Sequence, residues 1–387
     1  MKRIGVETVA LFSLYACLGA LQVSIAAAQI FFAIAALGWA WLVVSGQSRA
    51  EAPAFFRPLV LYAVLTLVAS AFSIDPVESL EDSKQLFLLL IVPVAFALLR
   101  GPRARTALRV VIAVGALSAI VGIVQYGVLQ YDNLGQRPQG ALGHYMTYSG
   151  VLMLTATAAV ARLLFDRHDR VWPAIVLPAL LVALVLTFTR SAWVGTCVAV
   201  ALLFLLKDFR LIGALPVLVA VFFALAPAQV TQRFYSMFDL KDPTSRDRVA
   251  MLREGARMIA ADPLTGMGPN MVERVYVRFR DTEAVERVNP HLHNVPVQIA
   301  AERGLPALGV WLWFVTSAAA GLIGLWRRNR QPLLAATGLG AMVAMAAAGM
   351  FEHNFGDSEF LMLLLTLLTL PFAAEQPGVE SGPAGTA

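Results

Sequence analysis

Residues 171–206 read VWPAIVLPALLVALVLTFTRSAWVGTCVAVALLFLL, and this stretch decides the fold. It consists of two apolar runs, 171–188 and 191–206, and Arg190 is its one charged residue. Each run is close to the roughly 20 residues that a helix needs to cross a bilayer. Two such runs joined by a tight turn predict a pair of membrane-spanning helices.

The same pattern continues in both directions along the chain. Mean hydropathy is +0.70, and 58% of residues are hydrophobic against 14% charged, which lies outside the range of a soluble domain. Only helices and closed barrels satisfy every backbone group in hydrocarbon, and barrel strands would be shorter and alternating. The sequence therefore predicts an all-α polytopic membrane protein with about twelve transmembrane helices. The expected spans are 6–23, 26–45, 57–73, 83–99, 107–125, 145–165, 171–188, 191–206, 210–226, 304–326, 332–350 and 356–373.

Basic residues fall mostly in alternate connections between these spans. If the N-terminus is cytoplasmic, it and the short loops on its side hold 16 Lys/Arg residues, whereas the short loops opposite hold Lys84, Arg137 and Arg190. This asymmetry follows the positive-inside rule. It predicts a multi-pass membrane protein with cytoplasmic termini and with the segment 227–303 outside, in the periplasm if the source is a Gram-negative bacterium. The net charge of +5 mostly reflects this bias and indicates no nucleic-acid partner.

The predicted organisation has four parts. Residues 1–226 hold transmembrane helices 1–9, 227–303 form a partly helical periplasmic loop, 304–373 hold helices 10–12, and 374–387 form a disordered, Gly/Pro-rich cytoplasmic tail. We expect the large loop to carry the chemistry, since it is the one long polar stretch of the chain.

Two features near the N-terminus allow a second interpretation. Lys2-Arg3, an apolar run and Ala26–Ala28 imitate a signal peptide with its cleavage site. Glu7 interrupts the run and another span follows at once, so we favour a retained first helix.

Cys17 and Cys197 fall inside spans without metal-ligand spacing, and we expect small apolar core residues rather than a disulfide.

The polar loop 227–303 holds 77 residues, two of the five histidines and 11 of the 30 Lys/Arg residues. Apolar residues at helical spacing predict an amphipathic helix over 246–261, capped by Thr244 or Ser245 and ended by Asp262-Pro263. A glycine turn follows at 263–268, which favours a tight turn over a phosphate-binding loop. The loop closes on Pro290-His291-Leu292-His293-Asn294, from which a second helical pattern runs to Gly304.

Arg190 is the other exceptional residue, because it lies between two apolar runs. A charge at membrane depth is costly and is by default a candidate for function. The alternative is an arginine that reaches a lipid phosphate at the membrane surface. The tight turn gives little other reason for a charge, so we favour function.

Together these motifs resemble the bacterial O-antigen ligase family, within the superfamily of polytopic GT-C-type glycosyltransferases that includes O-antigen polymerases and O-oligosaccharyltransferases. The resemblance covers about residues 140–310. In this family a His-Asn pair is followed, after nine residues, by glycine and, after two more, by Gly, Thr or Tyr. Here Gly304 stands at the glycine position, whereas Ala307 departs from the usual residues at the last position. The motifs that carry it are Thr189-Arg190-Ser191, Ser245-Arg246, Pro263-x-x-Gly266-x-Gly268 and His293-Asn294.

The resemblance implies transfer of a polysaccharide from undecaprenyl diphosphate to a sugar hydroxyl of lipid A-core, in lipopolysaccharide biosynthesis, with membrane lipids around the protein and no cofactor. The departing diphosphate needs fixed positive charge, which guanidinium groups provide through planar, bidentate hydrogen bonds. Arg190 and Arg246 are the candidates, with Arg253 and Arg257 in support.

The acceptor hydroxyl needs a base, and a histidine suits that task near neutral pH. We expect His293 to be this base, with Asn294 or Glu302 orienting it and His291 in support. Direct attack on the anomeric carbon would invert it. His353 also precedes an asparagine, but no glycine follows at the required spacing, so a loop or acceptor-contact role fits it better.

A metal site is the competing interpretation of the histidines. His144, His291, His293 and His353 all fall on the external side, and imidazole suits zinc or copper. No cysteine or close carboxylate pair completes the set, and the chain has no Asp-x-Asp to hold the ion of a metal-dependent glycosyltransferase. We therefore expect no metal and a mechanism in which arginines replace the cation.

Other functions stay open at this level. An O-antigen polymerase or a protein O-oligosaccharyltransferase would use the same donor with another acceptor. A secondary transporter would fit twelve spans, but no internal repeat is visible and the spans are almost free of acids. A structural scaffold would not need Arg190 or the histidine pair.

Overall fold

The computed structural model describes residues 5–239 and 241–377, and in these ranges it contains helices and no strands. In chain order the elements are α1 (Val6–Ala20), α2 (Ile25–Val44), α3 (Phe56–Ala71), α4 (Pro76–Asp82), the 3₁₀ helix η1 (Ser83–Leu90), α5 (Ile91–Leu98), α6 (Pro102–Gly127), α7 (Tyr145–Phe165), α8 (Val171–Leu186), α9 (Arg190–Lys207), η2 (Phe209–Ala214), α10 (Leu215–Leu225), α11 (Ala228–Tyr235), α12 (Pro243–Ala261), α13 (Val272–Phe279), α14 (Val295–Arg327), α15 (Pro332–Gly349), η3 (Asn354–Gly356) and α16 (Ser358–Glu375).

Length and apolar composition mark the membrane helices. Within the described ranges seven helices are long and apolar enough to cross a bilayer, namely α2, α6, α7, α9, α14, α15 and α16. Shorter apolar helices are α1, α3, α8 and the segment η2–α10. The all-α polytopic class predicted from the sequence is confirmed.

Two expected spans are not continuous α-helices. Residues 210–226 form η2 followed by α10. Residues 83–99 form η1 followed by α5, and the break lies just before Pro93. Proline has no N–H to donate to the carbonyl four residues earlier, so it fits only the first turn of the new helix. The chain thus crosses this part of the bundle as two short helices.

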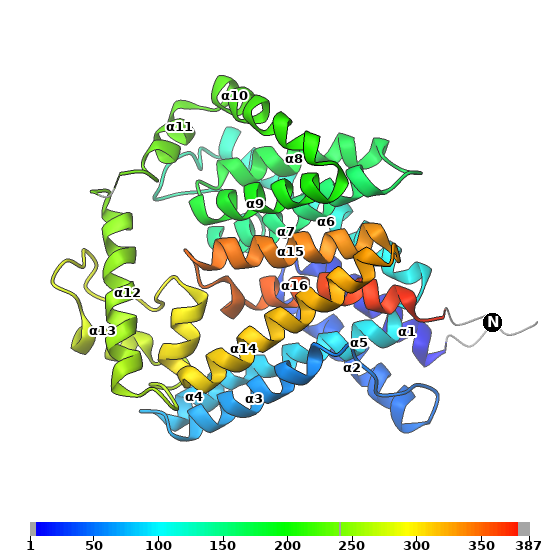
Figure 1. The fold of residues 1–387 in the computed structure, drawn as a ribbon, viewed down its shortest axis with the longest axis horizontal. Helices are drawn as coiled ribbons and strands as arrows, with labels where there is room; N and C mark the ends of the chain where they lie inside the picture. Colours follow the sequence, from blue (N-terminus) through cyan, green and yellow to red (C-terminus); the bar gives the residue numbers. More distant parts are fainter. Residues whose placement is uncertain (1–4, 240, 378–387) are drawn as a thin grey trace, which may run out of the picture.

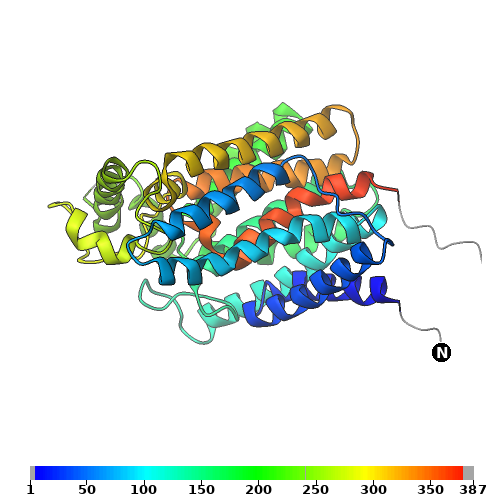
Figure 2. The ribbon, with the colours of Figure 1, turned by 90° about the horizontal axis from the view of Figure 1, so that it is seen from below.

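The bundle is built around α15, which packs on α7, α9, α14 and α16. Large apolar side chains such as Leu37, Leu117 and Trp313 are exposed on its outer faces, as expected where a helix faces lipid rather than water. Figure 1 shows α12 and α13 at one end of the bundle, with the start of α1 and the end of α16 at the other. Figure 2 shows the same arrangement from below.

The segment outside the bundle has a small core of its own. Met251, Met258, Met271, Tyr276 and Leu292 bring α12, α13 and the chain before α14 together. The helix expected over 246–261 is α12, but its N-cap is Asp242, whose carboxylate accepts a bond from the Ser245 N–H at 3.2 Å. Thr244 and Ser245 lie inside the helix because Pro243 occupies its first position, where a missing N–H costs nothing.

Three glycines lock this segment to the bundle. The Met267 and Gly268 N–H groups donate to the carbonyls of Ala301 and Glu302 at 2.8 and 3.0 Å. Gly266, Gly268 and Gly304 all have positive φ, and a Cβ on any of them would collide with the facing segment. The turn at 263–268 is therefore a close backbone contact, in agreement with the tight-turn interpretation, and Gly304 bends α14 where it enters the bundle.

Three further expectations concern the C-terminal tail, the N-terminus and the two cysteines. The tail was expected to begin at residue 374, but α16 continues to Glu375 because its apolar pattern persists. Residues 378–387, Lys2 and Arg3 lie outside the described residues. Cys17 is buried as expected, whereas Cys197 is exposed on the surface of α9, and both are free thiols.

Candidate active site

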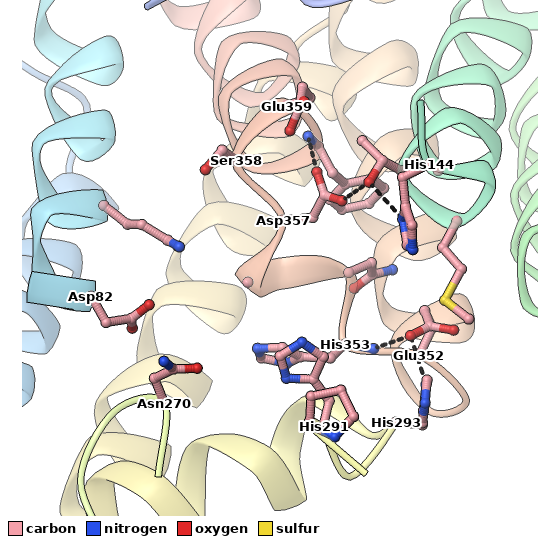
Figure 3. A pocket seen from close by; sticks show the side chains of 18 of the residues that line it. Asp82, His144, Asn270, His291, His293, Glu352, His353, Asp357, Ser358 and Glu359 are labelled. Atoms are coloured by element: carbon pink, nitrogen blue, oxygen red, sulfur yellow. Dashed lines mark hydrogen bonds and ion pairs between the residues drawn. The ribbon is translucent and has the colours of Figure 1, made fainter. Parts of the chain in front are cut away.

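A cavity of about 440 Å³ lies where the polar segment meets the bundle. Figure 3 shows its labelled side chains converging from separate elements. His291 and His293 come from the chain before α14, Glu352 and His353 from the loop after α15, and Asp357 from the start of α16. The other lining residues are Asp82, Gln85, His144, Met146, Thr147, Gly150, Asn270, Pro290, Glu302, Arg303, Asn354, Gly356, Ser358, Glu359 and Phe360.

His293 is paired with a carboxylate. Its Nδ1 lies 2.8 Å from Oε1 of Glu352, and both side chains are largely buried. Burial alone would raise the pKa of Glu352, but His293, the bond from His293 and the charge of Arg248 lower it to about 2. An ionised carboxylate can only accept a hydrogen bond, so Nδ1 of His293 donates to it, and in the uncharged form of the imidazole the lone pair is on Nε2. This is the geometry of an oriented general base.

The chain around His293 is held firmly. Asn294 caps α14 by accepting the Val297 N–H at 3.0 Å, and its Nδ2 donates to the Met350 carbonyl at 3.0 Å. The Gln298 side chain accepts the Leu292 N–H at 2.7 Å. Asn294 therefore fixes the backbone next to His293, while the side chain that orients the imidazole is Glu352 rather than Asn294.

Glu302 also lines the cavity but serves another purpose. Its carboxylate accepts bonds from Gln298 at 2.8 Å, Arg303 at 2.6 Å and the Asn270 N–H at 3.0 Å. These bonds join α14 to the turn that follows Gly268. No hydrogen bond links Glu302 to His293 in the described residues, because its oxygens are committed to this network.

Arg190 starts α9 and is almost fully buried. Its guanidinium donates to the carbonyl and hydroxyl oxygens of Ser236, both at 3.0 Å, and pairs with Asp242 at 3.3 Å. The side chain thus points toward α11 and the start of α12 rather than into lipid. Snorkelling to the membrane surface does not describe this geometry.

Arg190 belongs to a group that we call the arginine cluster, defined as Arg137, Arg190, Arg233 and Arg248. Burial, then Arg190 and Arg137, lowers the pKa of Arg233 to about 10. Burial and Arg190 also lower the pKa values of Arg137 and Arg248. Arg137, Arg233 and Arg248 therefore each lie within electrostatic range of Arg190.

The acids beside the arginine cluster are fewer than its cations. Asp242 lies against Arg190 and Arg233, and Glu352 acts on Arg248. Arg137 lies 4.2 Å from the centre of the Tyr145 ring, which in turn stacks on His144 at the cavity edge. A partly buried group with excess positive charge, next to the His293–Glu352 pair, suits a polyanion.

Arg246, Arg253 and Arg257 are not brought to this cluster. Arg246 is half exposed and pairs with Glu283 at 3.5 Å, while Arg253 and Arg257 pair with Asp281 at 3.7 and 2.7 Å. They hold the 280–287 loop on one face of α12. A step of two residues turns a helix by about 200°, so Arg248 projects from nearly the opposite face to Arg246.

Sequence reasoning missed Glu352 and, within the arginine cluster, Arg137, Arg233 and Arg248. Glu352 stands directly before His353-Asn354, but its sequence separation from His293 hides the pair. Arg248 stands two positions after Arg246, the arginine of the motif, so only the helix phase could have distinguished it.

His291 and His353 pack against each other at the cavity. The rings of His291 and His353 lie 5.2 Å apart. Burial lowers the pKa of His291 and places that of His353 well below its usual value, so both are neutral near pH 7. Across residues 5–239 and 241–377, no group of three or more His, Cys, Asp or Glu side chains has the arrangement of a metal site.

Residues 174–312 match a family model described as O-antigen ligase. The matched range includes Arg190, Arg233, Arg248, His293 and Gly304, whereas Arg137 and Glu352 lie outside it. No curated protein matches the chain.

Proposed function

We propose that this protein is an O-antigen ligase, because residues 174–312 match the O-antigen ligase family model and the activity of that family is of the ligase or polymerase type. It transfers a polysaccharide from undecaprenyl diphosphate to a sugar hydroxyl of lipid A-core. The observation that carries the proposal is the His293–Glu352 pair, which opens on a cavity and borders the arginine cluster. This combination supplies a base for an acceptor hydroxyl and positive charge for a departing diphosphate.

In the proposed reaction, Nε2 of His293 takes the proton from the acceptor hydroxyl as its oxygen attacks the anomeric carbon of the donor. The bond from that carbon to the diphosphate oxygen breaks, and undecaprenyl diphosphate leaves with the electron pair. The new imidazolium is stabilised by the Glu352 carboxylate at 2.8 Å. Attack opposite the leaving group inverts the anomeric centre, so a retained configuration in the product would rule this route out.

The arginine cluster takes the diphosphate in this scheme. Arg190 is already placed by Ser236 and Asp242, and Arg248 lies within electrostatic range of both Arg190 and the Glu352 carboxylate. We therefore assign to Arg248 the role that the motif suggests for Arg246. Positive groups fixed before the reaction cost no reorganisation as charge develops. The mechanism needs no metal, and activity that chelators abolish and magnesium restores would contradict it.

We propose that the end of the bundle with the cavity faces the periplasm. The start of α1 and the end of α16 lie at the opposite end of the bundle (Figure 1). In the predicted topology the basic short loops are on that same side. This orientation, in a bacterial inner membrane, follows the positive-inside rule. It puts the site on the side where a lipid-linked donor and lipid A-core can both reach it.

A deletion strain complemented with variants tests the proposal. Wild type should restore polysaccharide on lipopolysaccharide, whereas His293→Ala, Arg190→Ala and Arg248→Ala should not, although the lipid-linked polymer still forms. Loss of the polymer itself would instead identify a polymerase. Full activity of His293→Ala would remove the proposed base.

A further inference from the structure

The cavity wall opposite His293 is acidic. Asp357 accepts a hydrogen bond from the Thr147 hydroxyl, which also lies 3.2 Å from Nδ1 of His144, and Glu359 lies beside Asp357. Figure 3 shows this group at the far side of the cavity from Asp82 and Asn270. Neither Asp357 nor Glu359 forms an ion pair within the described residues, since the arginine of the cavity, Arg303, is paired with Glu302 at 2.6 Å and with Asp82 at 3.9 Å.

A second observation points to a ligand here. In the described part of the chain eleven buried side-chain polar atoms lack a hydrogen-bond partner, and five of them belong to residues that line this one cavity. Such atoms are costly to leave unpaired. They include donors and acceptors, as a ligand with several hydroxyl groups requires. The five are His291 Nδ1, Arg303 Nε, Glu352 Oε2, His353 Nδ1 and Asn354 Oδ1.

The two sides of His293 therefore differ in charge. The arginine cluster lies on one side, with its excess of guanidinium groups. The other side presents Asp357 and Glu359 near the neutral His291 and His353. Burial and the charge of Asp357 raise the pKa of Glu359 to about 7, so the negative charge on this side comes mainly from Asp357. A phosphate would be attracted to the first side and repelled from the second, whereas a hydroxyl-rich ring can donate hydrogen bonds to carboxylates.

We propose that this cavity is the subsite for the acceptor sugar, and that it selects a ring with free hydroxyls and without phosphate or carboxylate on the bound face. The inference rests on the proposed function. Asp357 and Glu359 accept hydrogen bonds from ring hydroxyls and keep the phosphate-bearing parts of both substrates out. The reacting hydroxyl then meets Nε2 of His293. The cavity volume of about 440 Å³ lies in the range of small-ligand sites.

Binding of small probes to the purified full-length protein tests this without any transfer reaction. The probes are a methyl hexopyranoside and its 6-phosphate, measured by saturation-transfer NMR in nanodiscs. Wild type should bind the neutral glycoside at least roughly tenfold more tightly than the phosphate. The double variant Asp357→Asn/Glu359→Gln should bind the neutral glycoside roughly tenfold more weakly and lose most of the discrimination.

The variants preserve the fold by design. Asp357 caps α16 by accepting the Phe360 N–H at 3.2 Å, and asparagine caps helices as well as aspartate. Gln replaces Glu359 at equal size. Glu81→Gln serves as the control, because Glu81 is an exposed carboxylate paired with Lys84 outside the cavity. It should leave both affinities unchanged.

Three results would overturn the subsite: no binding of the neutral glycoside by wild type, equal binding of the phosphate, or unchanged affinities in the double variant. The proposed function fails separately. His293→Ala should lose transfer but keep glycoside binding and its selectivity. Selective binding by a wild-type protein that transfers no glycan would retain the sugar site and reject the ligase.

Discussion

Replacing Glu352 with glutamine isolates the contribution of its charge to the proposed base. Glutamine has nearly the same size, and its carbonyl can still accept the Nδ1 proton of His293. What disappears is the negative charge 2.8 Å from the imidazole. That charge matters most when His293 has taken a proton, so the loss should appear in the rate-limiting chemical step rather than in substrate binding.

The magnitude follows from the hydrogen bond. A bond to a charged partner contributes about 1.5–3 kcal/mol. At about 1.4 kcal/mol for each tenfold change, Glu352→Gln should lower kcat by roughly 10- to 150-fold with little change in KM. If the amide instead turns its NH₂ toward His293 and reverses the tautomer, the loss would approach the larger effect of the equivalent change in a catalytic triad, about 10⁴-fold.

The assay is glycan transfer by purified protein at saturating donor and acceptor, with thermal unfolding measured in parallel. Glu286→Gln is the control, since Glu286 is an exposed carboxylate in the same polar segment. A kcat within twofold of wild type for Glu352→Gln, with His293→Ala inactive, would refute the idea that the carboxylate supports the base. A loss that tracks reduced thermal stability alone would refute it equally.

Three further predictions follow. Arg248→Ala should raise the KM for the lipid-linked donor and lower kcat by at least roughly tenfold. Arg246→Ala breaks only an exposed pair with Glu283, so it should change KM or kcat by less than about threefold. Kinetics measured as a function of donor concentration will distinguish the two variants. Gly304→Ala should destabilise the protein by several kcal/mol, visible as lost expression or a lower Tm, because φ 79° and ψ 168° form a conformation nearly confined to glycine. The lowered pKa of Glu352 stabilises the folded state at pH values above the normal carboxyl pKa near 4.5. This contribution, on the order of 3 kcal/mol at most, should be lost as the pH falls from about 4.5 to about 2. The stability of Glu352→Gln should therefore depend less on pH in that window, which acid unfolding will measure.

The helices could be predicted from the sequence because hydrocarbon leaves the backbone few alternatives. Each apolar run long enough to span had to become helical. The segment 83–99 shows the limit of that argument, since hydropathy does not register that Pro93 interrupts the hydrogen-bond ladder. Local rules likewise identified the glycine turn, but not that Gly304 is its packing partner.

The site was only partly predictable, for a reason visible in its residues. Arg190 and His293 stand out because a polar residue beside apolar runs is exceptional. Their partners do not stand out: Glu352 follows a different membrane helix, and Arg248 is one of several arginines on α12. Choosing Arg248 over Arg246 requires knowing which face of α12 meets the bundle, and that depends on the core formed by Met251 and Met258.

Backbone strain gives a separate reason to locate function at this place. Three of the six non-glycine residues with positive φ in the described ranges lie at the site: Phe188, two residues before Arg190, Asn270 on the cavity wall, and His293 itself. Each such conformation costs on the order of 1 kcal/mol or more and persists only where its surroundings fix it. At His293 the surroundings are the Asn294 cap, the Gln298–Leu292 bond and the Glu352 pair. A protein with only a structural role in the membrane has no need to hold a histidine in this conformation. A histidine that takes the proton of an acceptor hydroxyl does need it, because the conformation fixes the direction of Nε2.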